Sequence, residues 1–494
     1  SKMVGSVCLT ELRRRGLCKL LKDAKSSSSK RIVIDYSSPN IAKRFHIGNL
    51  RSTLIGRFTA KINESIGHSV HSINYLGDWG RQMALIIAYW PTMRPSQSYW
   101  NDISDSERVR LLTDCYIVGS RAMEDDIELK VRVRELHKKM EMIMMKSGRD
   151  SEELKEWKDI VDISSKHLQH FYSLFNCSFN KWLYESEESN RARSIVQSLL
   201  DKNIAIQDDE GVIIPHSKDE FYRIGRSDNT TLYLTRDISS LLYRDELFKG
   251  DEYIYVVERA QRNHFIALKR IMELIGREDL SEKIKHLSYG RVKGLSTRKG
   301  RTEAVEEIMH SGQELAIEWM KSSPTRKELA KEEEEETASK LAVSSLIVSE
   351  MRRARNSDYE FSWRRTFDPS GGNNALFLNS KYSRLCSIEE TNRDLMNKID
   401  NETQIIEEEA ARPLISSLIN VYSKSIESSI SNESHELTNS LLNLARECGK
   451  AGVTLRVKGE HDNISISRLC LLNLCKNVLS DGMNILGIDP IQKM

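Results

Sequence analysis

The fold prediction rests on residues 31–75, which read RIVIDYSSPNIAKRFHIGNLRSTLIGRFTAKINESIGHSVHSINY. The β-branched run at 31–36 predicts a strand, and the turn residues at 37–40 end it. Apolar residues then recur near the helical period until Gly67, which is placed to end a helix. Residues 69–75 read as a second strand. Together they predict a βαβ unit, which is typical of an α/β domain with a parallel sheet.

Helical patterns dominate the rest of the chain. From about residue 83 to residue 222 they interrupt the α/β pattern, which resumes near Leu232 and at 253–257. An inserted helical subdomain is the simplest interpretation. From Arg384 onward, leucine- and isoleucine-rich segments with serine-rich joints predict a separate helical bundle. The expected units are an N-terminal extension at 1–30, an α/β domain at 31–370 with an insertion at about 83–222, and a helical domain at 371–494.

Composition narrows the class of protein. Of 494 residues, 39% are hydrophobic and 30% charged, which is typical of soluble globular proteins. The formal net charge of +2 does not by itself indicate a nucleic-acid-binding protein, so any such surface must be local. The chain has no apolar run of about 18 residues, which excludes a membrane-spanning helix. The eight cysteines form no Cys-x-x-Cys pair, which favours a reducing compartment such as the cytosol or an organelle matrix.

The first thirty residues are basic and end in serines at 26–29. This bias is typical of an organellar transit peptide or its remnant. A surface helix followed by a serine linker explains the same residues equally well, so both interpretations stay open.

The turn after the first predicted strand carries His46, Ile47, Gly48 and Asn49 at a predicted helix N-terminus. Exposed backbone N–H groups and the helix dipole favour a phosphate there, and His46 and Asn49 can donate hydrogen bonds to it. Gly48 would let a nucleotide approach the backbone. Taken alone, the motif also fits an ordinary loop histidine.

A second candidate phosphate site is the segment at 291–301, which reads RVKGLSTRKGR and contains five basic residues, two glycines and no acid. A basic loop suits a polyphosphate leaving group, because phosphoryl chemistry is catalysed mainly by positioning and charge stabilisation. An ordinary basic surface loop is an equally good interpretation.

Tyr233 and Asp237 lie four residues apart, so they share one face if they belong to a helix. A phenol beside a carboxylate can hold a planar cation, and a carboxylate accepts a guanidinium through two hydrogen bonds. A plain surface pair has the same spacing, and this alternative stays open.

In order along the chain, these motifs resemble those of class I arginyl-tRNA synthetases. The similarity runs over residues 31–494. It is carried by DYSSPNIAKRFHIGNLRST at 35–53, NYLGDWG at 74–80, LYLTRDI at 232–238, YVVERAQ at 255–261 with His264, YGRVK at 289–293, LSTRKG at 295–300, DYEF at 358–361, RLCSI at 384–388 and LGIDP at 486–490.

This resemblance implies a Rossmann-like, doubly wound catalytic domain with a helical insertion, followed by an all-α anticodon-binding bundle. It also implies two reactions. Arginine and ATP give arginyl-adenylate and pyrophosphate, and the arginyl group then passes to the 2′-hydroxyl of the terminal adenosine of tRNA-Arg. Mg²⁺ would be carried on the phosphates, without a metal site in the protein.

The resemblance assigns roles residue by residue. The catalytic set is Lys43, His46, Asn49 and Lys299, and the ATP-binding set is His46, Gly48, Asn49, Lys293, Ser296 and Lys299. The guanidinium of arginine would be read by Asp35, Tyr233 and Asp237, and its α-amino and carboxylate groups would be held by Ser38, Asn40 and Gln261. A lysine substrate would leave acceptors of such a site unpaired, which disfavours it.

Three positions depart from the family pattern. Asn49 replaces the second histidine of H-x-G-H, Asp35 replaces a glutamate, and GGNNALFLN at 371–379 replaces D-T-G-P-Y-L-Q-Y. These departures raise a second hypothesis, a catalytically weak or inactive homologue that binds tRNA or acts as a scaffold. A third, another adenylyl-transferring enzyme, fits only the first eighty residues.

The resemblance favours the mitochondrial branch, because the residues before Arg31 are too few for an N-terminal tRNA-binding domain and the segment at 448–458 lacks an aromatic pair. We therefore expect a monomer of the mitochondrial matrix, with the cytoplasm as the alternative. Its partners would be L-arginine, ATP and a tRNA-Arg that can be unusually small, with no membrane. Candidate RNA surfaces, which solvated helix faces explain equally well, are Arg352, Arg353, Arg355 and the helix bearing Arg384.

Overall fold

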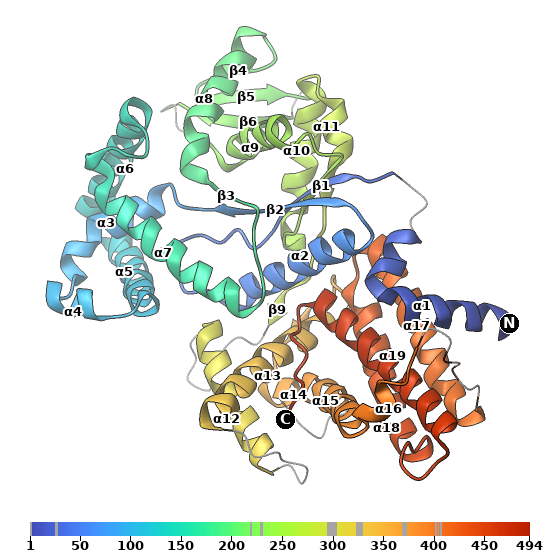
Figure 1. Ribbon diagram of the computed structural model, residues 1–494. Coiled ribbons are helices and arrows are strands. Elements are labelled where there is room, and N and C mark those ends of the chain that lie inside the picture. The colour runs from blue at the N-terminus through green and yellow to red at the C-terminus, as the bar shows by residue number, and fades with distance from the viewer. Residues whose placement is uncertain are drawn as a thin grey trace.

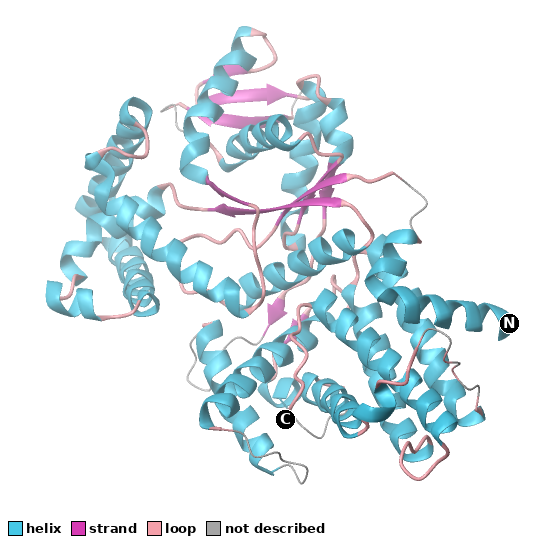
Figure 2. Cartoon of the chain, viewed as in Figure 1, coloured by secondary structure: helices cyan, strands magenta, loops and turns pink. Residues whose placement is uncertain are grey.

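The computed structural model describes residues 2–24, 28–217, 220–227, 231–293, 304–322, 330–367, 373–400, 403, 405 and 408–494. A twisted parallel sheet lies in the upper half of the molecule, and a bundle of helices fills the lower half (Figure 1, Figure 2). No helix in the described ranges is both long and apolar enough to span a bilayer.

The main sheet has five parallel strands in the order β3-β2-β1-β7-β8. Their bounds are β1 (Arg31–Asp35), β2 (Ser69–Leu76), β3 (Lys181–Tyr184), β7 (Glu252–Tyr255) and β8 (Ile284–His286). Strand β1 lies in the middle and the chain moves outward on both sides, which is the doubly wound arrangement. The predicted strands at 31–36 and 69–75, and the Rossmann-like sheet, are confirmed.

Helix α2 (Ile47–Ser65) connects β1 to β2 and packs against the sheet. Most of its residues are buried, so it is apolar over a broad face. A Cβ at Gly56 would lie 2.1 Å from Cγ of Tyr36, so only glycine lets the helix come this close to the chain that leaves β1. The helix ends just before Gly67, as the sequence predicts.

The segment after β2 differs from the expected single helical insertion at 83–222. Helices do fill its first part: α3 (Arg81–Met93), α4 (Gln97–Asp102), α5 (Asp105–Asp125), α6 (Ile127–Ser147), η1 (Glu152–Leu154) and α7 (Lys155–Leu174). The chain then returns to the main sheet as β3, passes through α8 (Glu185–Asp201), and forms a three-stranded antiparallel sheet from β4 (Ile206–Asp208), β5 (Gly211–Pro215) and β6 (Phe221–Arg226). The mostly helical character of 83–222 is confirmed, but its four strands were not predicted, because strands of three to six residues give too little alternation to be seen.

The remaining elements of the α/β half lead from this small sheet to the helical half. They are α9 (Tyr233–Phe248), η2 (Arg259–Gln261), α10 (Arg262–Leu274), α11 (Glu278–Lys283), β9 (Val292–Lys293), α12 (Val305–Ser322), α13 (Lys331–Met351), β10 (Tyr359–Glu360) and α14 (Trp363–Phe367). Strands β9 and β10 pair in parallel and join the α/β half to the segment after α13.

The C-terminal part of the chain, from Ala375 onward, is a helical bundle, as expected. Its elements are α15 (Ala375–Thr391), α16 (Arg393–Met396), η4 (Glu409–Ala411), α17 (Arg412–Ser431), α18 (Ser434–Thr454) and α19 (Asp462–Leu486). The N-terminal helix α1 (Lys2–Asp23) packs on α17 and α19 of this bundle (Figure 1). It buries Leu12, Leu17 and Leu21, and the backbone N–H of Leu17 donates to the Asp481 carboxylate at 3.0 Å. Helix α1 is therefore part of the bundle core.

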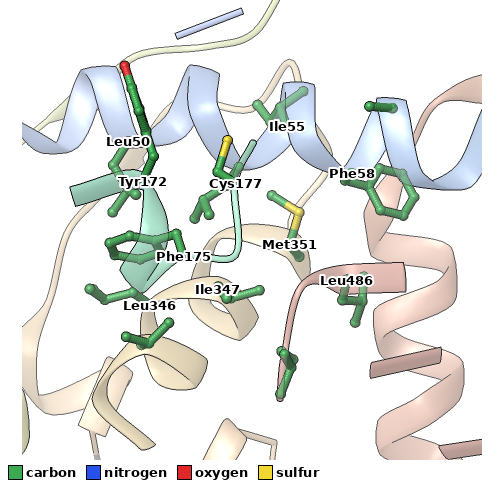
Figure 3. Packing of buried hydrophobic residues seen from close by; sticks show 14 of the residues in the cluster. Leu50, Ile55, Phe58, Tyr172, Phe175, Cys177, Leu346, Ile347, Met351 and Leu486 are labelled. Carbon is green, nitrogen blue, oxygen red and sulfur yellow. The ribbon is translucent and has the colours of Figure 1, made fainter. Parts of the chain in front are cut away.

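One hydrophobic core joins the two halves. Figure 3 shows Leu50 and Phe58 of α2 packed above Ile347 and Met351 of α13, with Leu486 of α19 beside them. All five side chains are nearly inaccessible to solvent. Each such burial stabilises the fold by roughly 1.5–3 kcal/mol, so helix α2 is fixed to the helical half as firmly as to the sheet.

Candidate active site

The strand order changes direction between β1 and β7, and the predicted site residues gather at the carboxyl ends of these strands. Strands β1 and β7 are neighbours, and their last residues, Asp35 and Tyr255, lie opposite each other in register. From β1 the chain enters the turn before α2, and from β7 it enters η2 and α10. In open parallel sheets, ligands bind outside the carboxyl ends of the strands at this point. Most of the predicted site residues follow these two strands.

Asp35 is buried and already engaged by protein groups. Its Oδ2 pairs with the Arg244 guanidinium at 2.7 Å, and its Oδ1 accepts from the Ser38 hydroxyl at 2.5 Å. Burial raises the pKa of Asp35, while Arg244 and Ser38 hold it back. Arg244 itself lies between the rings of Tyr75 and Tyr255, at 5.2 and 5.5 Å. Asp35, which was predicted to bind the guanidinium of the substrate, thus binds a guanidinium of the protein itself.

The Asp237 side chain remains partly accessible to solvent. Tyr233 and Asp237 belong to the first turns of α9, which confirms that they are on a helix. Oδ2 of Asp237 lies 2.6 Å from Nε2 of His264, and a third of the carboxylate side chain is exposed. Burial alone would lower the pKa of His264, but the hydrogen bond and charge of Asp237 outweigh it and raise that pKa. The Tyr233 ring is 70% exposed and lies 4.9 Å from the Arg236 guanidinium.

A third carboxylate, Glu185, was missed by the sequence analysis. It pairs with Arg236 at 2.8 Å, and its pKa is raised to about 7, chiefly by burial and also by the charges of Asp78 and Asp237. The charge of Asp237 likewise raises the pKa of Asp35. The charge of Asp237 therefore acts on both buried carboxylates, Asp35 and Glu185. Glu185 directly follows β3, so its position at a carboxyl end would have been visible had that strand been found.

The three residues expected around the α-amino and carboxylate groups of arginine differ in their surroundings. Ser38 joins the ends of β1 and β2, because its N–H donates to Oδ1 of Asn74 at 3.1 Å and its Oγ accepts from the Tyr75 N–H at 3.0 Å. Asn40 is exposed and its backbone pairs with Gly77. Gln261 is exposed at the end of η2. Asn40 and Gln261 are the two whose side chains remain open to solvent.

The residues predicted to bind ATP include the start of α2. His46 is the N-cap of this helix: its Nδ1 accepts from the Gly48 N–H at 3.1 Å, and Oδ1 of Asn49 accepts from the His46 N–H at 3.4 Å. Burial and the charge of Lys43 lower the pKa of His46, which favours the neutral ring. Because Nδ1 accepts, Nε2 carries the proton and is a donor. A Cβ at residue 48 would approach this ring to 3.0 Å, so glycine makes room for it.

The lysines and the basic segment are placed in part. Nζ of Lys43 lies 4.4 Å from the centre of the Tyr116 ring, and Nζ of Lys293 pairs with Asp358 at 3.3 Å. Ser296 and Lys299 fall outside the described residues. Downstream of them, Ala304 pairs with His46 in an antiparallel bridge, so the chain returns beside the nucleotide turn.

Two families match the chain in succession. One is described as tRNA synthetases class I (R), catalytic domain, and matches residues 16–363. The other is described as the DALR anticodon binding domain and matches residues 378–494.

Similar sequences and structures agree with these matches. The chain is 32% identical to a probable mitochondrial arginine--tRNA ligase of Bos taurus, over 94% of this chain and 78% of the relative. It is 30% identical to the cytoplasmic arginine--tRNA ligase of Saccharomyces cerevisiae, over 100% of this chain and 80% of the relative. The fold matches the arginyl-tRNA synthetase of Thermus thermophilus with a TM-score of 0.76 at 18% identity, covering 97% of this chain and 85% of that one. The chain therefore belongs to the arginyl-tRNA synthetases of class I.

Proposed function

We propose that the protein activates arginine with ATP and transfers the arginyl group to the terminal adenosine of tRNA-Arg. The observation that carries this proposal is a group of three carboxylates, Asp35, Asp237 and Glu185, in which the charge of Asp237 acts on the other two, together with the capped start of α2 beyond the same strand β1. A guanidinium suits the carboxylates, and a triphosphate suits the helix start. Family membership supports the same assignment.

The guanidinium of the substrate would bind Asp237, which is accessible, with Glu185 adding negative charge behind it. Tyr233 would cover the planar cation with its exposed ring. Asn40 and Gln261 would contact the α-amino and carboxylate groups. Asp35 and Ser38, which the sequence placed in direct contact with the substrate, would act instead by fixing Arg244 and the ends of β1 and β2.

On the other side, Nε2–H of His46 and the amide of Asn49 would donate to the phosphates at the positive end of α2. Gly48 would admit the nucleotide at this turn. Lys43, Lys293, Ser296 and Lys299 would supply charge and hydrogen bonds around the triphosphate, as the resemblance implies. Donors fixed before the reaction stabilise charge that grows on the α-phosphate and on the leaving pyrophosphate.

The reaction then has two steps. A carboxylate oxygen of arginine attacks the α-phosphorus of ATP, the bond to the β-phosphate oxygen breaks, and pyrophosphate leaves with the electron pair. The 2′-hydroxyl of the terminal adenosine next attacks the activated carbonyl, loses its proton, and AMP leaves. Mg²⁺ would enter on the phosphates. In the described ranges no group of three or more His, Cys, Asp and Glu side chains could hold a metal, and no step is assigned to the ion.

We further propose that the protein works as a monomer in mitochondria. Four of the similar proteins carry the name mitochondrial arginine--tRNA ligase, and the basic N-terminal residues fit that compartment, but similar cytoplasmic enzymes exist as well. Fractionation of cells that express a tagged full-length precursor tests the compartment. Light scattering of the purified chain tests the monomer.

Charging of tRNA-Arg transcripts by the purified chain tests the main proposal. Arginine should be attached in an ATP-dependent reaction, and Asp237→Ala should reduce kcat/KM for arginine at least about 100-fold, because a guanidinium loses its accessible carboxylate. Asp201→Ala is the matched control, since Asp201 is an exposed aspartate at the end of α8. A folded wild-type chain that binds tRNA without charging it would instead support the inactive homologue.

A further inference from the structure

A polar cavity lies where α13, α14 and α15 meet. Its volume is about 430 Å³, and among the residues that line it are Ser345, Arg352, Arg353, Arg365, Thr366 and Asn374. We call it the junction pocket, because it lies between the α/β half and the helical bundle. No acidic side chain is among its described lining residues.

Within the described residues, two of the three arginines of the junction pocket donate to neutral oxygen atoms. Nη1 of Arg352 donates to the Asn373 carbonyl at 2.9 Å, and Nη1 of Arg353 donates to the Ser349 hydroxyl at 3.2 Å. Neither they nor Arg365 forms an ion pair within the described part of the chain. Glu350, whose charge also acts on Arg353, is itself held by Arg51 at 2.8 Å. The pocket therefore concentrates positive charge for which the described residues supply no ion pair.

The wall of the pocket adds neutral donors. Ser345 is 1% exposed, and its hydroxyl finds no hydrogen-bond partner among the described residues. A buried hydroxyl without a partner is costly, so this group is a donor that is available to a ligand in the pocket. Asn374 is the N-cap of the 17-residue helix α15, whose N-terminus carries positive partial charge.

From this geometry we propose that the junction pocket binds a phosphodiester of the tRNA backbone. Arginine is the preferred partner of phosphate because its planar fork donates two parallel hydrogen bonds. A buried hydroxyl and a helix N-terminus are further donors that suit an anion. The inference rests on the proposed function, which supplies RNA as the substrate.

The position of the pocket explains why a backbone contact there would matter. Arg353 lies 4.3 Å from the centre of the Tyr359 ring, and Arg51 of α2 lies 5.0 Å from the same ring. Arg51 follows Asn49 by two residues, so the pocket and the nucleotide turn are joined through one aromatic ring and one helix. RNA held here would be anchored beside the element that carries the ATP-binding turn.

Filter binding of a tRNA-Arg transcript to the full chain tests this inference over a range of salt concentrations. The double variant Arg352→Gln/Arg365→Gln changes two exposed side chains, so it should fold normally. Its tRNA affinity should fall about 10-fold, and the slope of log affinity against log salt should shrink by about one or two, as expected for lost phosphate contacts. Arg94→Gln is the matched control, since Arg94 is also exposed and bonded only to a neutral side chain, Gln97. Equal affinity and slope for wild type and double variant would overturn the inference.

A second measurement separates the two sources of phosphate. Inorganic phosphate is compared with chloride at equal ionic strength for its effect on the thermal midpoint. Stabilisation of wild type but not of the double variant, with unchanged tRNA affinity, would mean a free-phosphate site and would contradict the RNA assignment. Arginine charging is measured on the same samples. Normal charging with unchanged binding rejects this inference alone, whereas no charging by wild type rejects the proposed function.

Discussion

The two halves of the proposed active site, the arginine side and the nucleotide side, differ in how their polar groups are held. On the arginine side, each carboxylate already has a protein partner: Arg244 for Asp35, Arg236 for Glu185 and His264 for Asp237. On the proposed nucleotide side, the start of α2 is capped by neutral side chains, because Nδ1 of His46 accepts from the Gly48 N–H and Oδ1 of Asn49 accepts from the His46 N–H.

The difference follows from the cost of burying charge. A carboxylate can stay ionised in the protein interior only if cations and hydrogen bonds stabilise its charge. The arginine half is therefore part of the folded core. A helix N-terminus costs little when empty, because a side-chain cap replaces the ligand. Substitutions on the first side should therefore damage stability, and those on the second should damage catalysis while the fold survives.

The largest expected effect is on the arginine side. Arg244→Met removes a guanidinium that is 2% exposed and leaves Asp35 buried without its counter-charge. The free energy of unfolding should fall by about 3–5 kcal/mol, as measured by urea denaturation. Arginine charging would be lost as a consequence of the unfolding.

The double variant Asp35→Asn/Arg244→Met is the control for this prediction. It removes both charges, so it should recover at least half of the lost free energy of unfolding. If Arg244→Met is as stable as wild type, the ion pair does not stabilise the fold and the proposed contrast between the halves is wrong.

The second prediction concerns the nucleotide side. His46→Ala removes the donor Nε2–H and the cap of α2. Arginine-dependent ATP–pyrophosphate exchange, with tRNA present, should fall about 10²–10³-fold, as for the loss of one fixed donor to a developing anion. The free energy of unfolding should fall by only about 1 kcal/mol, which is typical of a lost N-cap. A loss of activity explained wholly by unfolding would contradict the contrast.

Sequence patterns predicted the nucleotide side better than the arginine side, for a physical reason. A strand, a turn and a helix start are contiguous, so residues 31–75 contain β1, the turn after it and the start of α2, whereas Lys293, Ser296 and Lys299 lie far along the chain. The arginine side is assembled from separate strands. Asp237 was found through its spacing from Tyr233, whereas Glu185 was missed because β3 is four residues long.

Arg244 could have been suspected from its spacing alone. It follows Asp237 by seven residues on α9, which places both on one face of the helix. What the sequence could not show is that Arg244 points at Asp35, because that contact joins β1 to a helix more than two hundred residues later. Helix α1 illustrates the same limit, since its basic residues suggested a leader or a surface helix while its leucines enter the core of a distant bundle.

A third prediction uses pH to change the arginine side alone. The pKa of His264 is raised by Asp237, and that of Glu185 is about 7. Glu185 loses its proton around pH 7, and His264 keeps its proton to a higher pH than an ordinary histidine because Asp237 raises its pKa. A rise in pH from 6 to 8 therefore makes this group of side chains more negative while the substrate guanidinium stays cationic. The KM for arginine should therefore fall about 10-fold over this range. The KM for ATP is the internal control, and His264→Gln should weaken the dependence. A KM for arginine that is constant or rises with pH would refute the assignment of these groups to the guanidinium.

The smallest effect is expected at the position where the chain departs most visibly from its family. Asn49→His restores the second histidine of the motif, yet the asparagine already completes the capping box through Oδ1 and keeps an amide N–H₂ that can donate to phosphate. ATP–pyrophosphate exchange should therefore change by less than about 3-fold. The control variant Asn49→Ala removes both the capping oxygen and the amide donor. A gain of about 100-fold would mean that Asn49 is a catalytic defect, so the native chain would be the weak homologue. A small change would show that an amide at this helix position serves the nucleotide as well as an imidazole does.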